Sequence, residues 1–212
     1  TWKNSEKAWE VYNGWLQHNV DSIDGRALWT SLISAKNYDF YVKMTVRDGV
    51  FSGVILRDEG DSNTGYIVVI QGMSGYLGDV QSNEGVIQVF DGKFTDGINQ
   101  WELLYTSPSI GVRGTHDPFR VRLIDNKFEF WYDSTASPKF SWIDEEYRHS
   151  KPSKPILCTH AGYGSVLVYF DDIKQEVANE DGVVWIQNQV DSKTPVFSTQ
   201  RTLLSVEYGG EE

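Results

Sequence analysis

Polar and aromatic side chains stand at the ends of two apolar runs in this 212-residue sequence. Arg57 and Gln71 each follow an apolar run, and Tyr66 opens the second run. Because burying an unpaired charge is costly, Arg57 must reach water, a partner or a ligand. Planar groups such as arginine and glutamine pair with hydroxyls, and aromatic rings stack on apolar ring faces. A sugar offers both surfaces, and the candidate contacts are Arg57, Tyr66, Gln71, Tyr41, Trp131 and Trp142.

A structural role competes with ligand binding for two of these candidates. The alternative for Arg57, the first candidate, is an ion pair with Asp58 or Asp39. Trp131 and Arg120 fall on one outer face of a predicted hairpin, where an ordinary cross-strand cation–π pair is the favoured interpretation.

Four aspartates form a candidate calcium site. Asp21 and Asp24 lie in an early turn-rich segment, and Asp171 and Asp172 lie in a late strand. Calcium takes hard carboxylate and carbonyl oxygens. Successive strand residues point to opposite faces, so one of the late pair can point inward, and we assign the metal to Asp21, Asp24 and Asp172. The alternative is that Asp172 is a solvated or turn-capping carboxylate.

Catalysis has the weakest support. Asp144, Glu145 and Glu146 follow Trp142, but a solvated charge run is the preferred interpretation. Glycoside hydrolysis needs two carboxyls about 5 Å or about 6.5–9.5 Å apart, which a sequence does not show. No nucleophile elbow or phosphate loop occurs in the sequence, and its four histidines lack metal-ligand spacing. A non-catalytic domain is therefore favoured.

The amino-acid composition of the chain limits the classes of molecule that it could bind. The net charge of −11 argues against nucleic acid and anionic membranes. No run approaches the roughly 18 apolar residues of a membrane span. The 8 Trp, 11 Tyr and 10 Phe favour strands and binding surfaces. Cys158 is the single cysteine, which excludes an intrachain disulfide. The first residue is Thr1, from which we expect a processed, extracellular or cell-surface protein.

The elements that must position these residues are strands. Residues 51–57 and 66–71 form a hairpin that is apolar on both faces, so it should be central. Residues 38–47 alternate, and 165–177 form a long closing strand. Residues 134–155, which hold Trp142, read as irregular. Many strands separated by turn signals predict an all-β sandwich over 1–178. Residues 179–212 form an extension that could add edge strands to the same domain.

The clearest hairpin covers residues 119–132. A two-residue turn at Asp125 and Asn126 places Arg120 opposite Trp131 and Arg122 opposite Glu129. The opposite face is then apolar and belongs to the core. Its members are Phe119, Val121, Leu123, Phe128, Phe130 and Tyr132.

Four segments, taken in order, resemble the concanavalin A-like lectin/glucanase superfamily. They are 9–17 (WEVYNGWLQ), 25–46 (GRALWTSLISAKNYDFYVKMTV), the hairpin SGVILRD with GYIVVI, and 162–173 (GYGSVLVYFDDI). The chain is similar to fructan-binding carbohydrate modules and to domains described as 3-keto-disaccharide hydrolases, and more distantly to laminin-G and thrombospondin C-terminal domains. The superfamily's Glu-x-Asp-x-x-Glu catalytic strand is absent, and Asn99-Gln100-Trp101 replaces the hydrolase group's Trp-Asn pair.

The resemblance implies a jelly roll of two curved antiparallel sheets, with a ligand on the concave face or at its rim. It places Arg57 at the concave end. We therefore expect an extracellular carbohydrate-binding domain, with a glycan or cell-surface glycoconjugate as partner and a structural calcium ion. The alternatives are a glycoside hydrolase of the same fold and an adhesion domain that binds protein.

Overall fold

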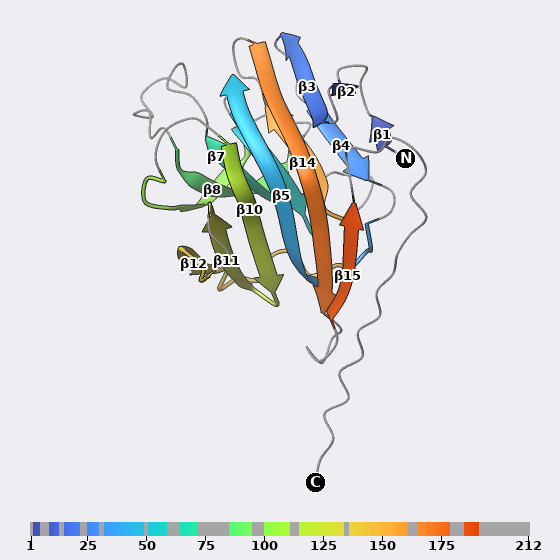
Figure 1. Ribbon diagram of the computed structural model, residues 1–212. Coiled ribbons are helices and arrows are strands. Elements are labelled where there is room, and N and C mark those ends of the chain that lie inside the picture. Colours follow the sequence, from blue (N-terminus) through green and yellow to red (C-terminus); the bar gives the residue numbers. More distant parts are fainter. Residues whose placement is uncertain are drawn as a thin grey trace.

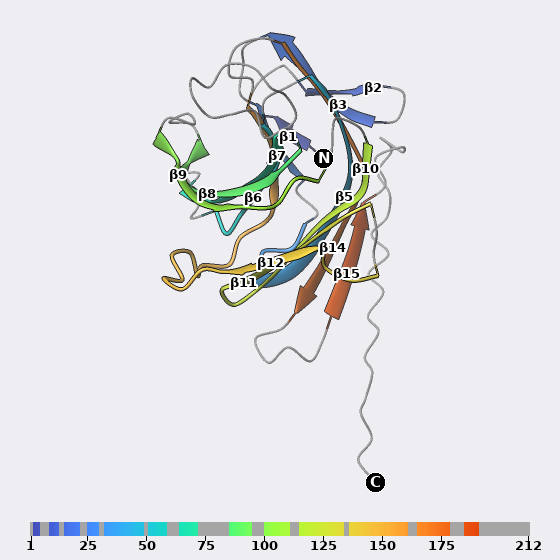
Figure 2. The same ribbon diagram turned by 90° about the vertical axis from the view of Figure 1, so that its left-hand side faces the viewer.

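The computed structural model is a sandwich of two antiparallel sheets, which Figures 1 and 2 show as two layers. The residues that the structure describes are 2–4, 9–12, 15–21, 25–29, 32–48, 51–58, 64–71, 85–94, 100–110, 115–133, 136–160, 165–178 and 185–190. Within these ranges the named elements are all strands, and none is a helix able to cross a membrane. The predicted all-β sandwich is confirmed.

Each sheet runs across the molecule from the N-terminal strands to an edge strand. Sheet A contains, in spatial order, β1 (Trp2–Asn4), β4 (Gly25–Trp29), β13 (Ile156–His160), β6 (Phe51–Leu56), β7 (Thr64–Gln71), β8 (Ile87–Lys93) and β9 (Glu102–Thr106). Sheet B contains β12 (Phe140–Ile143), β11 (Lys127–Tyr132), β10 (Thr115–Ile124), β5 (Asn37–Asp48), β14 (Ser165–Ala178), β3 (Trp15–Asp21) and β2 (Trp9–Tyr12), and β15 (Trp185–Val190) pairs with β14.

The β6–β7 hairpin is buried on both faces, as its sequence predicts. Val54 pairs with Val68 and faces the main core between the sheets. Ile55 pairs with Ile67 and faces a second apolar cluster on the other side of sheet A. The strands approach closely at Gly53, where a Cβ would lie 2.0 Å from the carbonyl oxygen of Val68. Only glycine fits there.

The β10–β11 hairpin has the predicted register. Arg120 pairs with Trp131 and Arg122 with Glu129. Five of the six predicted core residues are fully buried, and Tyr132 is half-buried. The alternation of apolar and polar residues therefore fixed which face of this hairpin enters the core.

The structure differs from one prediction about an irregular segment and agrees with another. Residues 140–143 form strand β12 rather than a loop, because Phe140 and Trp142 turn inward while Ser141 and Ile143 stay exposed. In the predicted extension, β15 pairs with residues 173–178 of β14 and adds an edge strand to sheet B. The part after 190 lies outside the described residues.

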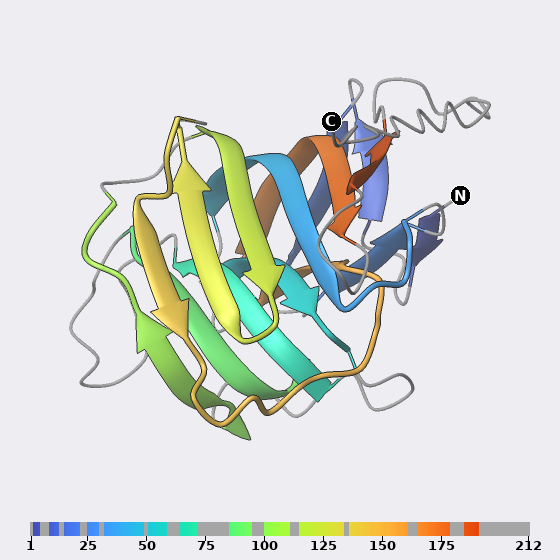
Figure 3. The same cartoon turned by 90° about the horizontal axis from the view of Figure 1, so that it is seen from below.

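The edge strands β9 and β12 bring the two sheets together at one side of the sandwich. Figure 3 shows the gold β12 beside the green β9. Among the described residues, β9 pairs only with β8, and β12 pairs only with β11. The loop that follows β12 lies beside both edges and borders the site described next.

Candidate functional site

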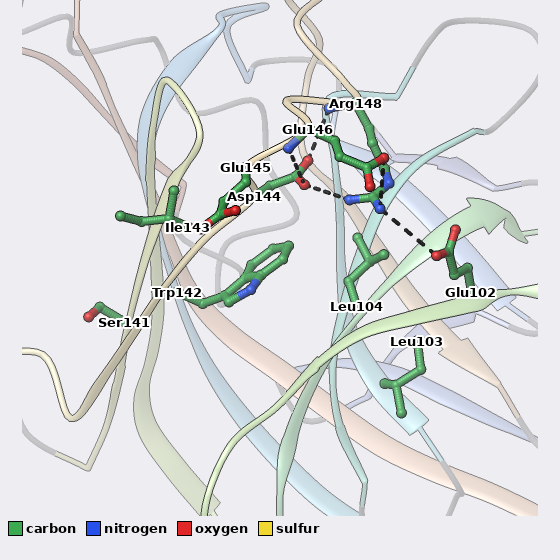
Figure 4. Close-up of a pocket in the computed structure, with 10 residues that line it drawn as sticks. All are labelled: Glu102, Leu103, Leu104, Ser141, Trp142, Ile143, Asp144, Glu145, Glu146 and Arg148. Atoms are coloured by element: carbon green, nitrogen blue, oxygen red, sulfur yellow. Dashed lines mark hydrogen bonds and ion pairs between the residues drawn. The ribbon is translucent and has the colours of Figure 1, made fainter.

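A cavity of about 620 Å³ opens between β9 and β12 (Figure 4). We call it the edge cleft. Its lining residues come from β9, from β12 and from the loop 144–148: Glu102, Leu103, Leu104, Ser141, Trp142, Ile143, Asp144, Glu145, Glu146 and Arg148. One aromatic ring, several aliphatic side chains and four carboxylates therefore share one concave surface.

Trp142 is the aromatic residue of the edge cleft. It pairs with Phe128 across β11 and β12, and the two ring centroids lie 5.2 Å apart. Tyr105 of β9 stacks on it with centroids 5.9 Å apart and planes 24° apart. These contacts hold a half-buried indole, and Figure 4 shows it pointing towards Leu104. A pre-positioned ring of this kind offers a stacking surface at small entropic cost.

Asp144 is a buried anchor below the cleft. Its Oδ2 accepts hydrogen bonds from the Tyr66 hydroxyl (2.5 Å) and the Arg148 amide (3.0 Å). Its Oδ1 accepts from the Glu146 amide (3.3 Å) and from Arg148 Nη1 (2.5 Å). Burial raises the pKa of Asp144, but these donors and the Arg148 charge together hold it below its ordinary value. Four hydrogen bonds hold this carboxylate in place, so it positions the loop.

Arg148 connects the carboxylates at one end of the cleft. Besides Asp144, its Nη2 lies 3.0 Å from Glu146 Oε2 and 3.9 Å from Glu102 Oε1, and its Nε lies 3.8 Å from Asp91 Oδ2. The side chains of Glu146 and Glu102 nevertheless stay 72% and 66% exposed. These two carboxylates therefore remain available to a ligand.

A second layer of contacts fixes the far end of the same loop. His149 Nε2 lies 2.8 Å from Asp91 Oδ1, and the His149 amide donates to the Tyr66 hydroxyl at 3.3 Å. Tyr147 has a positive φ of 51°, which bends the chain back between Asp144 and His149. Residues 144–149 are thus tied to the central strand β7 and to β8.

Arg57, the leading candidate from the sequence, does not line the cleft. It is fully buried, and its guanidinium donates to the carbonyls of Lys36 (3.0 Å) and His149 (2.8 Å) and to Asn37 Oδ1 (3.4 Å). Its predicted ligand contact is wrong for this conformation. Arg57 instead has a structural role, as the alternative predicted. Its main partners are backbone carbonyls and not the expected aspartate. Asp39 pairs with two other arginines, Arg120 and Arg122.

Two further candidates also lie away from the edge cleft. Tyr41 lies on the outer face of sheet B, where its hydroxyl donates to Glu176 at 3.3 Å. Trp131 lies on that face as well, and Arg120 stacks on it with the guanidinium 4.0 Å from the ring centroid. The cation–π interpretation of this pair is confirmed. Trp131 is buried, so it offers little surface to a ligand.

Of the remaining candidates, Tyr66 is buried and supports the cleft through Asp144. Gln71 ends β7 opposite Phe51, and its side chain lies outside the described residues. Among the predicted ligand residues whose side chains the structure describes, Trp142 alone lines the cleft.

The structure separates two of the predicted calcium ligands. Asp21 pairs with Ser165 at one end of β14, whereas Asp172 lies seven positions along that strand, roughly 20 Å away. Asp172 is exposed at a bulge with a φ of 49°, which matches the solvated alternative. Asp24 lies outside the described residues. Within the described ranges, no group of three acidic, histidine or cysteine residues could hold a metal. Calcium stays a prediction, and one site cannot use both Asp21 and Asp172.

Glu102 and Arg148 are the cleft residues that sequence reasoning missed. Glu102 begins a strand whose sequence carries no motif, so no local pattern marks Glu102 as a site residue. Arg148 follows Asp144 by four residues, a spacing that permits a local ion pair and was the one available signal. Both become recognisable only when β9 and β12 meet.

Two exposed carboxylates of the cleft lie close together. Glu102 and Glu146 both approach Arg148 Nη2, and their separation permits two-carboxylate chemistry. These carboxylates and the Trp142 ring line the same concave surface.

Comparison with known proteins supports the fold. No protein-family model matches the sequence, and no curated protein matches it. Among solved structures, the carbohydrate binding module CBM66 from Bacillus subtilis matches with a TM-score of 0.59 and 13% identity, over 82% of this chain and 94% of that one. The laminarinase catalytic domain from Thermotoga maritima matches at 0.51 and 12%, over 78% of each chain. A legume lectin-like domain from Entamoeba histolytica matches at 0.51 and 13%, over 84% and 90%. The concanavalin A-like jelly roll is confirmed.

Proposed function

We propose that this domain binds a glycan in the edge cleft, with Trp142 as the stacking surface. The observation that carries the proposal is a half-buried indole, held by Tyr105 and Phe128, beside the exposed carboxylates of Glu102 and Glu146. Sugar rings present an apolar face to an aromatic side chain and hydroxyl donors to carboxylates. The cleft presents both kinds of partner on one surface.

Three further observations support binding of an extended ligand. The cavity of about 620 Å³ falls within the usual size of small-ligand sites. It is open along two sheet edges, so an oligosaccharide can extend beyond it. Leu103 and Ile143, the exposed large apolar residues of the described chain, both line it at 51% exposure. Solved structures of the same fold include a carbohydrate binding module and a lectin-like domain.

We propose a secreted or cell-surface location, where a glycan or glycoconjugate would be the partner. The structural calcium ion remains part of this proposal, although no group of three acidic, histidine or cysteine side chains among the described residues could hold it. A protein partner is the alternative, because exposed apolar residues on sheet edges also suit protein contacts.

The test is a glycan array followed by titration calorimetry of the best ligand, with calcium and again with EDTA. Trp142→Ala should raise the dissociation constant by about ten-fold or more, and Trp142→Phe should raise it less. Tyr41→Ala is the matched control, because it removes a half-buried aromatic from the outer face of sheet B. Equal binding by wild type and Trp142→Ala would overturn the proposal. A blank array under both conditions would move the assignment to a protein ligand.

A further inference from the structure

We infer that the edge cleft selects glycans that carry protonated amino groups over their N-acetylated or uronic acid counterparts. The inference rests on the proposed function and adds the ligand class. Glu102 and Glu146 are the specificity-determining residues. The chemistry required of the ligand is a pyranose ring for Trp142 and an ammonium group within reach of these carboxylates.

The first step is the charge of the cleft. Four carboxylates line it, from Glu102, Asp144, Glu145 and Glu146. Among its described lining residues, Arg148 is the sole cation. The cleft is therefore negative overall, as is the chain with its net charge of −11. A uronic acid placed on Trp142 would face like charges, whose close approach is unfavourable.

The second step is that Arg148 is already engaged. Its Nη1 lies 2.5 Å from Asp144, its Nη2 lies 3.0 Å from Glu146, and its Nε faces Asp91. An anionic ligand would have to replace these contacts to reach the guanidinium, and Asp144 would then lose a buried partner. Arginine is the usual carboxylate binder in proteins, but here its donors point at the protein's own carboxylates.

The third step is the spare acceptor capacity of Glu102 and Glu146. An ionised carboxylate has about four lone-pair sites. The Glu102 side chain is 66% exposed, and its contact with Arg148 Nη2, at 3.9 Å, is at the limit of an ion pair. Glu146 is 72% exposed and shares a single nitrogen with it. An ammonium group brought beside Arg148 would meet both carboxylates at once.

The ring of Trp142 decides between an amino sugar and a simple cation. Trp142 and Leu104 give the cleft an apolar surface beside its charged end, and Leu103 extends from the other side of β9 (Figure 4). A glucosamine-type unit covers an apolar wall with its ring and presents its ammonium group at the edge. A bare cation or a short basic peptide lacks the flat apolar face. A ligand contacts both the apolar side chains and the carboxylates of the cleft only if it combines a flat apolar ring with an ammonium group.

Titration calorimetry on the intact chain tests the inference with three oligosaccharides of equal length. They are a chitin oligomer, its fully deacetylated form, and an oligogalacturonate. At low salt we expect the deacetylated form to bind about ten-fold more tightly than the acetylated one, because two exposed carboxylates would attract its ammonium groups. The oligogalacturonate should not bind. The preference should shrink at about 1 M salt, where the Debye length is about 3 Å.

Variants separate the inference from the proposed function. Glu102→Gln/Glu146→Gln should remove the preference, because it should lower affinity for the deacetylated oligomer more than affinity for the acetylated one. Glu176→Gln, on the outer face of sheet B, is the matched control and should keep the preference. Equal affinities of wild type for the two chitin forms, or no binding of the deacetylated form, overturn the inference. If Trp142→Ala still lowers affinity for a neutral glycan, the proposed function stands. If Trp142→Ala changes no affinity, the proposed function fails as well.

Discussion

The hydroxyl of Tyr66 donates a 2.5 Å hydrogen bond to Oδ2 of Asp144, 78 residues away along the chain. This bond joins the central strand β7 of sheet A to the loop that follows the edge strand β12 of sheet B. It spans the sandwich directly below the edge cleft. The position of Asp144 in turn sets Arg148 and Glu146 through three further hydrogen bonds.

Tyr66→Phe removes this hydroxyl while keeping the ring. A buried hydrogen bond to a charged group contributes about 1.5–3 kcal/mol, so we expect the free energy of unfolding to fall by about 2 kcal/mol. Chemical denaturation measures the change. Tyr105→Phe, at a half-buried tyrosine outside this network, should change stability by less than about 0.5 kcal/mol. Equal stability of Tyr66→Phe and wild type would show that the bond contributes nothing.

Acid should destabilise the domain partly through Asp144. Burial raises the pKa of this carboxyl, yet the bonds from Tyr66 and Arg148 hold it below its ordinary value of 3.8. A lowered pKa in the folded state stabilises the protein above the unfolded value. That stability is lost as pH falls from about 4 through the folded pKa. Unfolding free energies measured between pH 7 and pH 2 should therefore decline less steeply at the acid end in Asp144→Asn than in wild type. If the unfolding free energies of wild type and Asp144→Asn fell by the same amount with pH, Asp144 would not contribute to the acid sensitivity.

Arg57→Ala should damage folding and not recognition. It leaves the buried carbonyls of Lys36 and His149 and the Asn37 side chain without their donor. Each unsatisfied buried group costs about 1–3 kcal/mol, so we expect a loss of about 3 kcal/mol or more. The exposed Lys127→Ala should cost under about 0.5 kcal/mol. An unchanged melting temperature together with lost glycan binding would restore Arg57 as a ligand residue.

Gly53→Ala should prevent normal folding. The added Cβ would lie 2.0 Å from the Val68 carbonyl oxygen in the middle of β6, so the central hairpin could not keep its spacing. Thermal denaturation of soluble protein, or its absence from the soluble fraction, provides the readout. Ser52→Ala, one residue earlier, is the control. Its buried hydroxyl has no hydrogen-bond partner among the described residues, so its loss should be nearly neutral. Wild-type stability in Gly53→Ala would contradict the close packing.

Local sequence patterns predicted most of the fold. In residues 119–132 the two-residue turn sets the register, and strict alternation then assigns each side chain to a face. The consecutive apolar residues of β6 and β7 likewise required cover on both faces, which the two apolar clusters supply. These inferences need only neighbours within a hairpin.

The edge cleft depends on contacts that no local pattern encodes. Glu102 and Arg148 meet because β9 and β12 end as neighbouring edges of different sheets. Arg57 was placed correctly at a strand end, but the sequence does not show that the carbonyls of Lys36 and His149 surround it. Trp142 was recognised as a candidate because aromatic residues suit sugars, although its segment was expected to be irregular and is a strand.

The most direct test of the central claim is the affinity of Trp142→Ala for the glycan that wild type binds best, measured by titration calorimetry. Nucleic-acid bases stacked on aromatic side chains contribute on the order of 1–3 kcal/mol. We expect a sugar ring on Trp142 to contribute on the same order, so the dissociation constant should rise by about ten-fold or more. The melting temperature should fall only modestly, because the indole is half-buried. An unchanged dissociation constant in correctly folded Trp142→Ala would show that glycans bind elsewhere or not at all.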